Sequence, residues 1–109
     1  MQLSSDQSNG VSILRLAGRF DAHETTQVRE WFQTNQPTQV VVNLSGVNFL
    51  DSSALSVLVQ EMKRRRERGG DLLLAGLLQP VRIIFELTRL DRAFKIVSTE
   101  EEAIALLRK

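Results

Sequence analysis

The chain has 109 residues, with fourteen Lys and Arg against thirteen Asp and Glu, and no cysteine. Its 42% hydrophobic and 25% charged residues are the usual composition of one globular domain, here residues 1–109, and exclude a disordered, collagen-like or coiled-coil chain. A formal net charge of +1 argues against a nucleic-acid partner, and the absence of cysteine excludes disulfides, zinc–thiolate sites and a thiol nucleophile.

A hairpin and a helix are predicted for the first third of the chain. Asn9-Gly10 is a strong hairpin signal because both positions tolerate positive φ. The apolar residues after it predict a strand over 11–17, and a short polar strand over 2–7 is its expected partner. After a loop over 18–21, apolar residues at the spacing of one helical face predict a helix over 22–35.

Strands and helices alternate in the rest of the chain. The β-branched run at 40–44 is typical of a central strand that is buried on both faces. A loop that opens at Ser45 and ends at Asp51-Ser52-Ser53 separates it from an amphipathic helix, which Gly69-Gly70 ends. The remaining elements are a buried strand at 72–75, a helix opened by Pro80, a short strand at 94–97 and a helix capped at Ser98-Thr99.

This order of elements predicts the fold class. Alternating strands and helices are typical of an α/β domain, here with a mixed, mostly parallel central sheet that is covered by helices. The early hairpin makes the sheet mixed. Loops at the carboxyl ends of neighbouring parallel strands share one edge of such a sheet. If the strands over 11–17 and 40–44 are parallel neighbours, Asp21 and Asp51 lie together on that edge.

The tripeptide Asp51-Ser52-Ser53 has two interpretations. Asp and Ser are preferred N-cap residues, because their oxygens accept hydrogen bonds from free amides of the first helical turn. A serine in that turn is also accessible to a kinase, and a phosphate adds about −1.5 to −2 charges at pH 7. A loss of about 3 kcal/mol in partner binding would lower affinity more than a hundredfold. The apolar residues just before the tripeptide, Val47, Phe49 and Leu50, are expected core anchors, of which one exposed member could contact a partner.

Residues 42–55, VNLSGVNFLDSSAL, closely resemble the central motif of the STAS domain, a family that includes bacterial anti-sigma factor antagonists. Three other stretches resemble family motifs in the same order and at the same spacing. They are Gly18-Arg19-Phe20-Asp21, the Gly69-Gly70 turn with the strand after it, and the late helix region from Val81 to Phe94. The resemblance covers nearly the whole chain, and the set of motifs is specific although each one is weak.

The resemblance implies a protein-interaction module that phosphorylation controls. Antagonists of this family bind an anti-sigma factor that is also a serine kinase, and binding releases a sigma factor. Phosphorylation of a serine at the start of the second helix blocks binding, and a serine phosphatase reverses the modification. The family motif maps the phosphorylated residue onto Ser53, with Ser52 as the fallback. The implied partner-binding residues are Asp21, Asp51, Ser52, Ser53 and Ala54.

Two positions depart from the family pattern, because Ala54 and Arg89 stand where the family usually has glycine. Ala54 could hinder close approach of a partner, and Arg89 puts the end of the late helix in question. The resemblance also leaves an alternative open. Some STAS proteins are never phosphorylated and act as scaffolds or as accessory subunits of transporters.

Catalysis has little support in the sequence. His23 is the only histidine, and neither a Gly-x-Ser-x-Gly motif nor a glycine-rich phosphate or dinucleotide loop is present. We therefore expect no enzyme, no cofactor and no metal site. The basic run Lys63-Arg64-Arg65-Arg66, with Arg68, is expected to be a solvated helix face on which Glu61 and Arg65 form an i,i+4 pair.

The start of the chain, Met1 to Asp6, has neither the basic nor the apolar region of a signal peptide. The longest apolar runs are far shorter than the roughly 18 residues that a membrane-spanning helix needs. We expect a cytoplasmic protein that does not insert into a membrane.

Overall fold

The strands of the computed structural model, which describes residues 1–108, lie in one sheet in the order in which they follow along the chain. β1 and β2 form an antiparallel hairpin, and β2, β3, β4 and β5 are parallel to one another. Asn9 and Gly10 have φ of 53° and 82° in the hairpin turn, as the turn signal predicts. The strands are β1 (Gln2–Ser8), β2 (Val11–Phe20), β3 (Gln39–Leu50), β4 (Asp71–Ala75) and β5 (Lys95–Val97).

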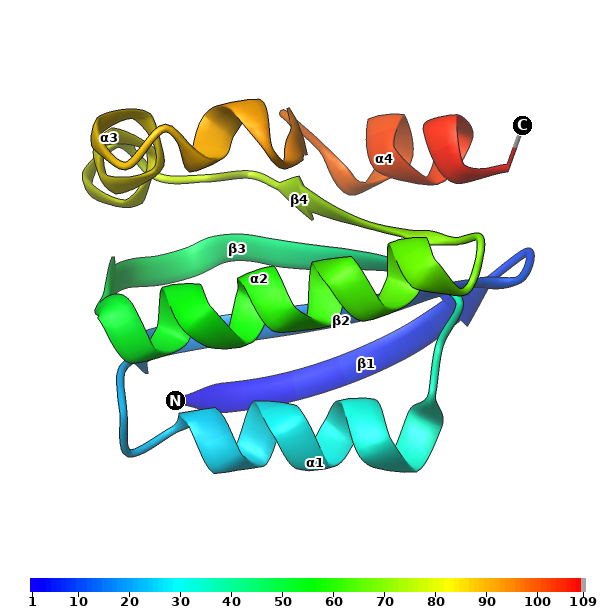
Figure 1. The fold of residues 1–109 in the computed structure, drawn as a ribbon, viewed down its shortest axis with the longest axis horizontal. Helices are drawn as coiled ribbons and strands as arrows, with labels where there is room; N and C mark the ends of the chain where they lie inside the picture. The colour runs from blue at the N-terminus through cyan, green and yellow to red at the C-terminus, as the bar shows by residue number, and fades with distance from the viewer. Residues whose placement is uncertain (109) are drawn as a thin grey trace.

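Helices cover both faces of this sheet, which confirms the predicted α/β fold with a mixed, mostly parallel sheet (Figure 1). The longest helix, α2, crosses the sheet beside α1, and the short helix α4 packs on the opposite face. The helices are α1 (Thr25–Asn35), α2 (Ser52–Glu67), α3 (Gln79–Leu87) and α4 (Glu100–Leu107), with a 3₁₀ turn η1 (Leu90–Arg92) between α3 and β5.

The core is divided unequally between the two faces. The larger cluster lies between the sheet and α1, α2 and α3, and is built around Phe20, Phe32 and Phe85, which are each almost completely buried. The smaller cluster, under α4, joins Val11, Val41, Leu73, Ala75 and Ala103. Alternate residues of β3 and β4 therefore face different clusters, and both strands are buried on both faces, as their apolar runs predict.

Two strands are longer than the sequence predicts. β2 continues through Phe20 and β3 through Leu50, so the expected loops after Ala17 and from Ser45 are wrong. The two strands pair along these extensions, where Gly18 lies opposite Val47 and Phe20 opposite Leu50, with irregularities in the register at two points. Each strand supplies the hydrogen-bond partners of the other, which is why polar residues such as Ser45 remain in extended structure.

Arg89, which replaces a family glycine, sits in the left-handed region with φ of 63° at the start of η1. Glycine enters this region at no steric cost, whereas a residue with a Cβ is strained there. α3 ends before it, at Leu87, and Arg89 turns the chain toward η1. The late helix thus ends as it would with glycine, at some cost in backbone strain.

Candidate functional site

The carboxyl ends of β2 and β3 meet at one edge of the sheet, which is where the sequence places the site. Phe20 and Leu50 are the paired last residues of the two strands. The backbone N–H of Asp51 donates to the carbonyl of Phe20 over 3.3 Å. The β2–α1 loop, which contains Asp21, and the start of α2 are therefore neighbours, as the parallel arrangement predicts (Figure 1).

Asp51 holds these two segments together with its side chain. Its Oδ1 accepts from the backbone N–H of Ala54 at 3.0 Å, which makes Asp51 the N-cap of α2. Its Oδ2 accepts from the backbone N–H of Ala22 at 3.0 Å, across the β2–α1 loop. Both carboxylate oxygens are thus engaged within the domain. Asp51 thus positions the loop against the helix. Its bond to Ala22 has no signature in the local sequence.

Asp21 is also engaged, although it lies at the same edge. Its Oδ1 accepts from the backbone N–H of His23 at 3.0 Å, and its Oδ2 lies 3.4 Å from the Nε of Arg19. This Asx turn shapes the β2–α1 loop. His23 is exposed beside it. Asp21 and Asp51 therefore place two carboxylates at the edge, one within the loop and one at the start of α2.

The two serines differ in accessibility. Ser52, the first residue of α2, is exposed, whereas Ser53 is half-buried. Ala54 is completely buried and belongs to the larger core cluster. Its methyl group faces the interior, so it neither obstructs a partner nor offers one a contact from the surface. Of the expected partner-binding residues, Ala54 is thus the one that the fold turns away from solvent.

A cation–aromatic pair extends the site along the ends of β2 and β3. The guanidinium carbon of Arg19 lies 3.8 Å from the ring centre of Phe49, which is its neighbour in the strand register. Phe49 is half-buried, whereas Val47 and Leu50 are buried. Phe49 is therefore the one of the three expected core anchors that is partly accessible to a partner. Its pairing with Arg19 depends on the register of two parallel strands, which local sequence patterns do not specify.

The helix α3, which lies at the same end of the molecule as the start of α2 (Figure 1), carries two exposed apolar side chains. Leu87 is 79% exposed and Ile83, one turn before it, is 41% exposed. Val81 and Phe85 fill the core from the other side of the helix. The helical spacing of Val81, Phe85 and their neighbours predicts that buried face, but it leaves these two large exposed residues unnoticed.

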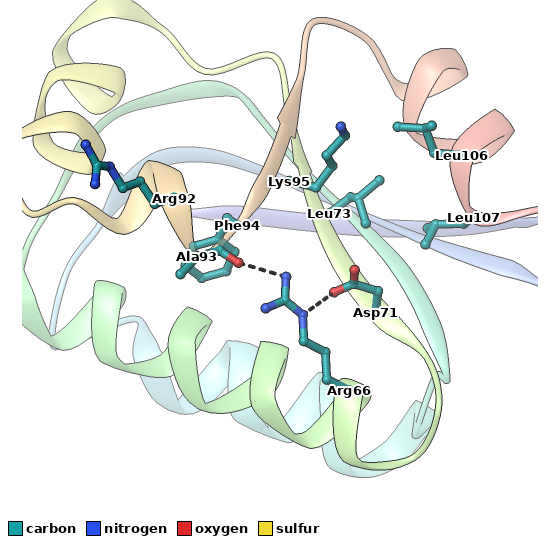
Figure 2. Close-up of a pocket in the computed structure, with 9 residues that line it drawn as sticks. All are labelled: Arg66, Asp71, Leu73, Arg92, Ala93, Phe94, Lys95, Leu106 and Leu107. Atoms are coloured by element: carbon teal, nitrogen blue, oxygen red, sulfur yellow. Dashed lines mark hydrogen bonds and ion pairs between the residues drawn. The ribbon is translucent and has the colours of Figure 1, made fainter.

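The basic run of α2 is exposed, as the sequence predicts, at every position except Arg65. Glu61 and Arg65 do form the expected i,i+4 pair, at 3.2 Å, but both are buried, because α1 packs over this side of α2. Arg66 bridges to β4 and η1: its Nε donates to Oδ1 of Asp71 at 3.0 Å and its Nη2 to the carbonyl of Ala93 at 2.7 Å (Figure 2). Arg65 and Arg66 thus hold parts of the fold together through their side-chain hydrogen bonds.

Figure 2 shows the pocket of about 440 Å³ beside this bridge, at the amino end of β5. Because it lies at the opposite edge of the sheet from Ser52, it is not part of the candidate site. Within residues 1–108, no three His, Asp or Glu side chains are grouped so that they could hold a metal ion. No helix in this part of the chain is long and apolar enough to cross a membrane.

Comparisons with known protein families and with individual proteins point to the same family. The sequence model of the STAS domain family matches residues 2–103. The chain is 29% identical to the anti-sigma F factor antagonist of Paenibacillus polymyxa over 98% of this chain and 95% of that protein. It is 32% identical to the anti-sigma-B factor antagonist of Listeria monocytogenes over 80% of this chain and 79% of that protein.

Anti-sigma factor antagonists are also found among the solved structures that this chain resembles. The anti-sigma factor antagonist SpoIIAA in its unphosphorylated form superposes with a TM-score of 0.84 and 26% identity, over 98% of this chain and 96% of that one. SpoIIAA, a Bacillus protein, has also been solved in a phosphorylated form.

Proposed function

The chain belongs to the STAS domain family, and we propose from this premise that it is an anti-sigma factor antagonist controlled by phosphorylation. Its unphosphorylated form binds an anti-sigma factor that is also a serine kinase, and binding releases a sigma factor. Phosphorylation at the start of α2 blocks binding, and a serine phosphatase restores it. Two relatives that carry the name of anti-sigma factor antagonist support this role.

The observation that carries the proposal is a pair of serines in the first turn of α2 that both reach the surface, at the edge that also carries Asp21 and Asp51. The family motif points to Ser53, but the exposed side chain is that of Ser52. A half-buried serine in the first helical turn still reaches the surface, so Ser53 stays the proposed acceptor and Ser52 the alternative. Either residue lies in the turn whose free amides and helix dipole stabilise an added phosphate.

The same phosphate is unfavourable for a bound partner. It adds about −1.5 to −2 charges at pH 7 directly beside Asp51, at an edge that already carries the carboxylate of Asp21. A partner that packs against this edge must remove water from all of these charges. A penalty of about 3 kcal/mol lowers affinity more than a hundredfold. The domain itself stays folded, because the phosphate remains at the surface of a helix end.

The partner surface that we propose is wider than the serine pair. It includes the exposed side chains of Ile83 and Leu87 on α3, which supply apolar area at the same end of the molecule. Arg19 on Phe49 forms its other margin. An apolar centre with charged groups at the margin is the usual composition of a specific protein interface.

The test uses the purified chain and the serine-kinase anti-sigma factors of its own genome. Each kinase is incubated with ATP and wild type, Ser52→Ala or Ser53→Ala, the modified residue is mapped by mass spectrometry, and affinity is measured before and after modification. We expect one kinase to modify wild type and Ser52→Ala but not Ser53→Ala, and affinity to fall more than a hundredfold. Loss of modification in Ser52→Ala alone would instead assign Ser52.

Equal affinity of the unmodified and the fully phosphorylated chain would contradict the switch. So would a serine pair that stays unmodified with every kinase and in protein recovered from cells under several growth conditions. That result would support the alternative of a scaffold or transporter accessory subunit that is never phosphorylated.

A further inference from the structure

A second polar site lies between α1 and α2, far from the serine pair. Ser52 begins α2 and Arg65 lies thirteen residues further along, which is about 20 Å at the helical rise of about 1.5 Å per residue. Here a pocket of about 130 Å³ opens between the two helices. Its polar lining consists of Gln33 and Gln36 from the end of α1, and Glu61, Arg64, Arg65 and Arg68 from the end of α2.

Arg65 is the unusual member of this lining. It is only 2% exposed, and its guanidinium carbon lies 5.1 Å from the ring centre of Phe32, across the contact between the helices. Its Nη1 donates to Glu61 at 3.2 Å, but its buried Nε has no hydrogen-bond partner among the described residues. Buried donors are normally satisfied, and a charged one without a partner is costly.

The charges around the pocket do not balance. The two carboxylate oxygens of Glu61 are each held by an arginine, Oε1 by Arg65 at 3.2 Å and Oε2 by Arg64 at 3.0 Å. Within the part of the chain that the structure describes, Arg68 forms no ion pair. Three arginines therefore face one carboxylate. Burial lowers the pKa of Arg65, against the attraction of Glu61, and the charges of Arg68 and Arg64 add to the lowering.

We infer that this pocket binds a small oxyanion of the phosphate class, held by Arg65 and Arg68 with Arg64 at its margin. Guanidinium groups are planar donors that match the oxygens of such anions, which is why arginine is favoured at phosphate sites. The pocket of about 130 Å³ has room for an anion with four oxygens. The amide groups of Gln33 and Gln36 offer further donors. The inference is independent of the proposed switch, because it uses none of its residues.

The competing explanation is that the arginines only offset the negative carboxyl-terminal ends of the two helices. α1 has no basic residue in its own last turn, so cations from α2 would serve both helices. This explanation predicts a contribution to stability that does not depend on phosphate, whereas an anion site predicts a saturable effect of phosphate.

Inorganic phosphate is the probe for the test. The full chain is titrated with phosphate at constant ionic strength, with sodium chloride as the balancing salt, and followed by thermal unfolding and by ¹H–¹⁵N spectra that include the arginine Nε–H signals. We expect the unfolding temperature to rise with phosphate as a one-site isotherm requires, and the largest spectral shifts at Arg65 Nε and at the end of α1.

Arg68→Gln tests the assignment, because Arg68 follows α2 and its loss leaves the buried Glu61–Arg65 pair in place. Its matched control is Arg29→Gln, which removes the same charge from an exposed position of α1 outside the pocket lining. We expect Arg68→Gln to weaken phosphate binding at least about tenfold, as loss of one charged hydrogen bond does, and Arg29→Gln to leave it unchanged.

Three results would overturn the inference. The first is the absence of a saturable effect of phosphate on wild type, the second an equal loss of binding in Arg68→Gln and Arg29→Gln, and the third spectral shifts spread over the basic surface without Arg65. Arg65→Lys is a second variant that keeps the charge but removes the planar group. Weaker phosphate binding by folded Arg65→Lys supports the site, and unchanged binding contradicts it.

Discussion

Replacement of Asp51 by alanine should destabilise the domain more than the loss of an ordinary helix cap. One oxygen of Asp51 caps α2 and the other holds the β2–α1 loop at Ala22, each over 3.0 Å. Loss of an N-cap costs about 1 kcal/mol, and loss of the second, partly exposed bond to a charged group about 1 kcal/mol more. We therefore expect Asp51→Ala to lower the free energy of unfolding by about 2 kcal/mol.

Thr99 supplies the matched control. It caps α4 through a single bond of 3.2 Å from the backbone N–H of Glu102, so Thr99→Ala should cost only about 1 kcal/mol. In a domain of this length 1 kcal/mol corresponds to about 4 °C, so thermal and urea unfolding resolve the two variants. Asn at position 51 can still accept from Ala54, so Asp51→Asn should lose mainly the bond to the loop. Its loss of stability should lie between those of Asp51→Ala and Thr99→Ala. Equal losses in Asp51→Ala and Thr99→Ala would refute a double role for Asp51.

Three further predictions concern other parts of the fold. Glu100 binds Arg15 through two bonds of 2.7 and 3.0 Å, and these bonds lower the pKa of its carboxyl group. The pair should therefore contribute its full stability above about pH 4.3 and lose it as the pH falls through the lowered pKa. Glu100→Gln should be less stable than wild type by about 0.5–1 kcal/mol at pH 7. Urea unfolding should show that this difference vanishes at acidic pH. Arg89→Gly should raise the unfolding temperature by relieving a strained φ, with a net gain of about 0.5–1 kcal/mol, and a decrease would show that the Arg89 side chain stabilises η1. Gly70→Ala should cost about 1–3 kcal/mol in urea unfolding, because a Cβ there overlaps a backbone carbonyl of the segment before β3; a loss below 0.5 kcal/mol would mean that this segment yields freely.

The order of elements could be predicted because each one carries its own local signal. Asn9-Gly10 marks the turn, alternating or continuous apolar residues mark the strands, and Pro80 stands in the first turn of α3. The shared edge of Asp21 and Asp51 followed from the parallel arrangement of two neighbouring strands alone. These features depend on residues close together in the chain or on general rules of sheet topology.

The features that could not be predicted depend on contacts with segments that are distant in the sequence. Ser45 and Gly46 remain in β3 because β2 runs alongside them, with Gly46 opposite Ala17. Glu61 and Arg65 are buried because α1 packs over that side of α2, and no charge pattern within α2 says which side this is. The second bond of Asp51, to Ala22, joins residues 29 positions apart. Local patterns identify a candidate site, whereas its accessibility and its internal bonds come from tertiary packing.

The strand order β1-β2-β3-β4-β5 allows the domain to be assembled in the direction of its synthesis. Every strand finds the preceding one already in place and adds to its free side, so no strand has to wait for a later partner. The contact between the early and the late part of the chain can form only once α4 is present. It is made by Arg15 of β2 and Glu100 of α4, which are 85 positions apart. A nascent chain can therefore complete the β2–β3 edge and the start of α2 before α4 has left the ribosome.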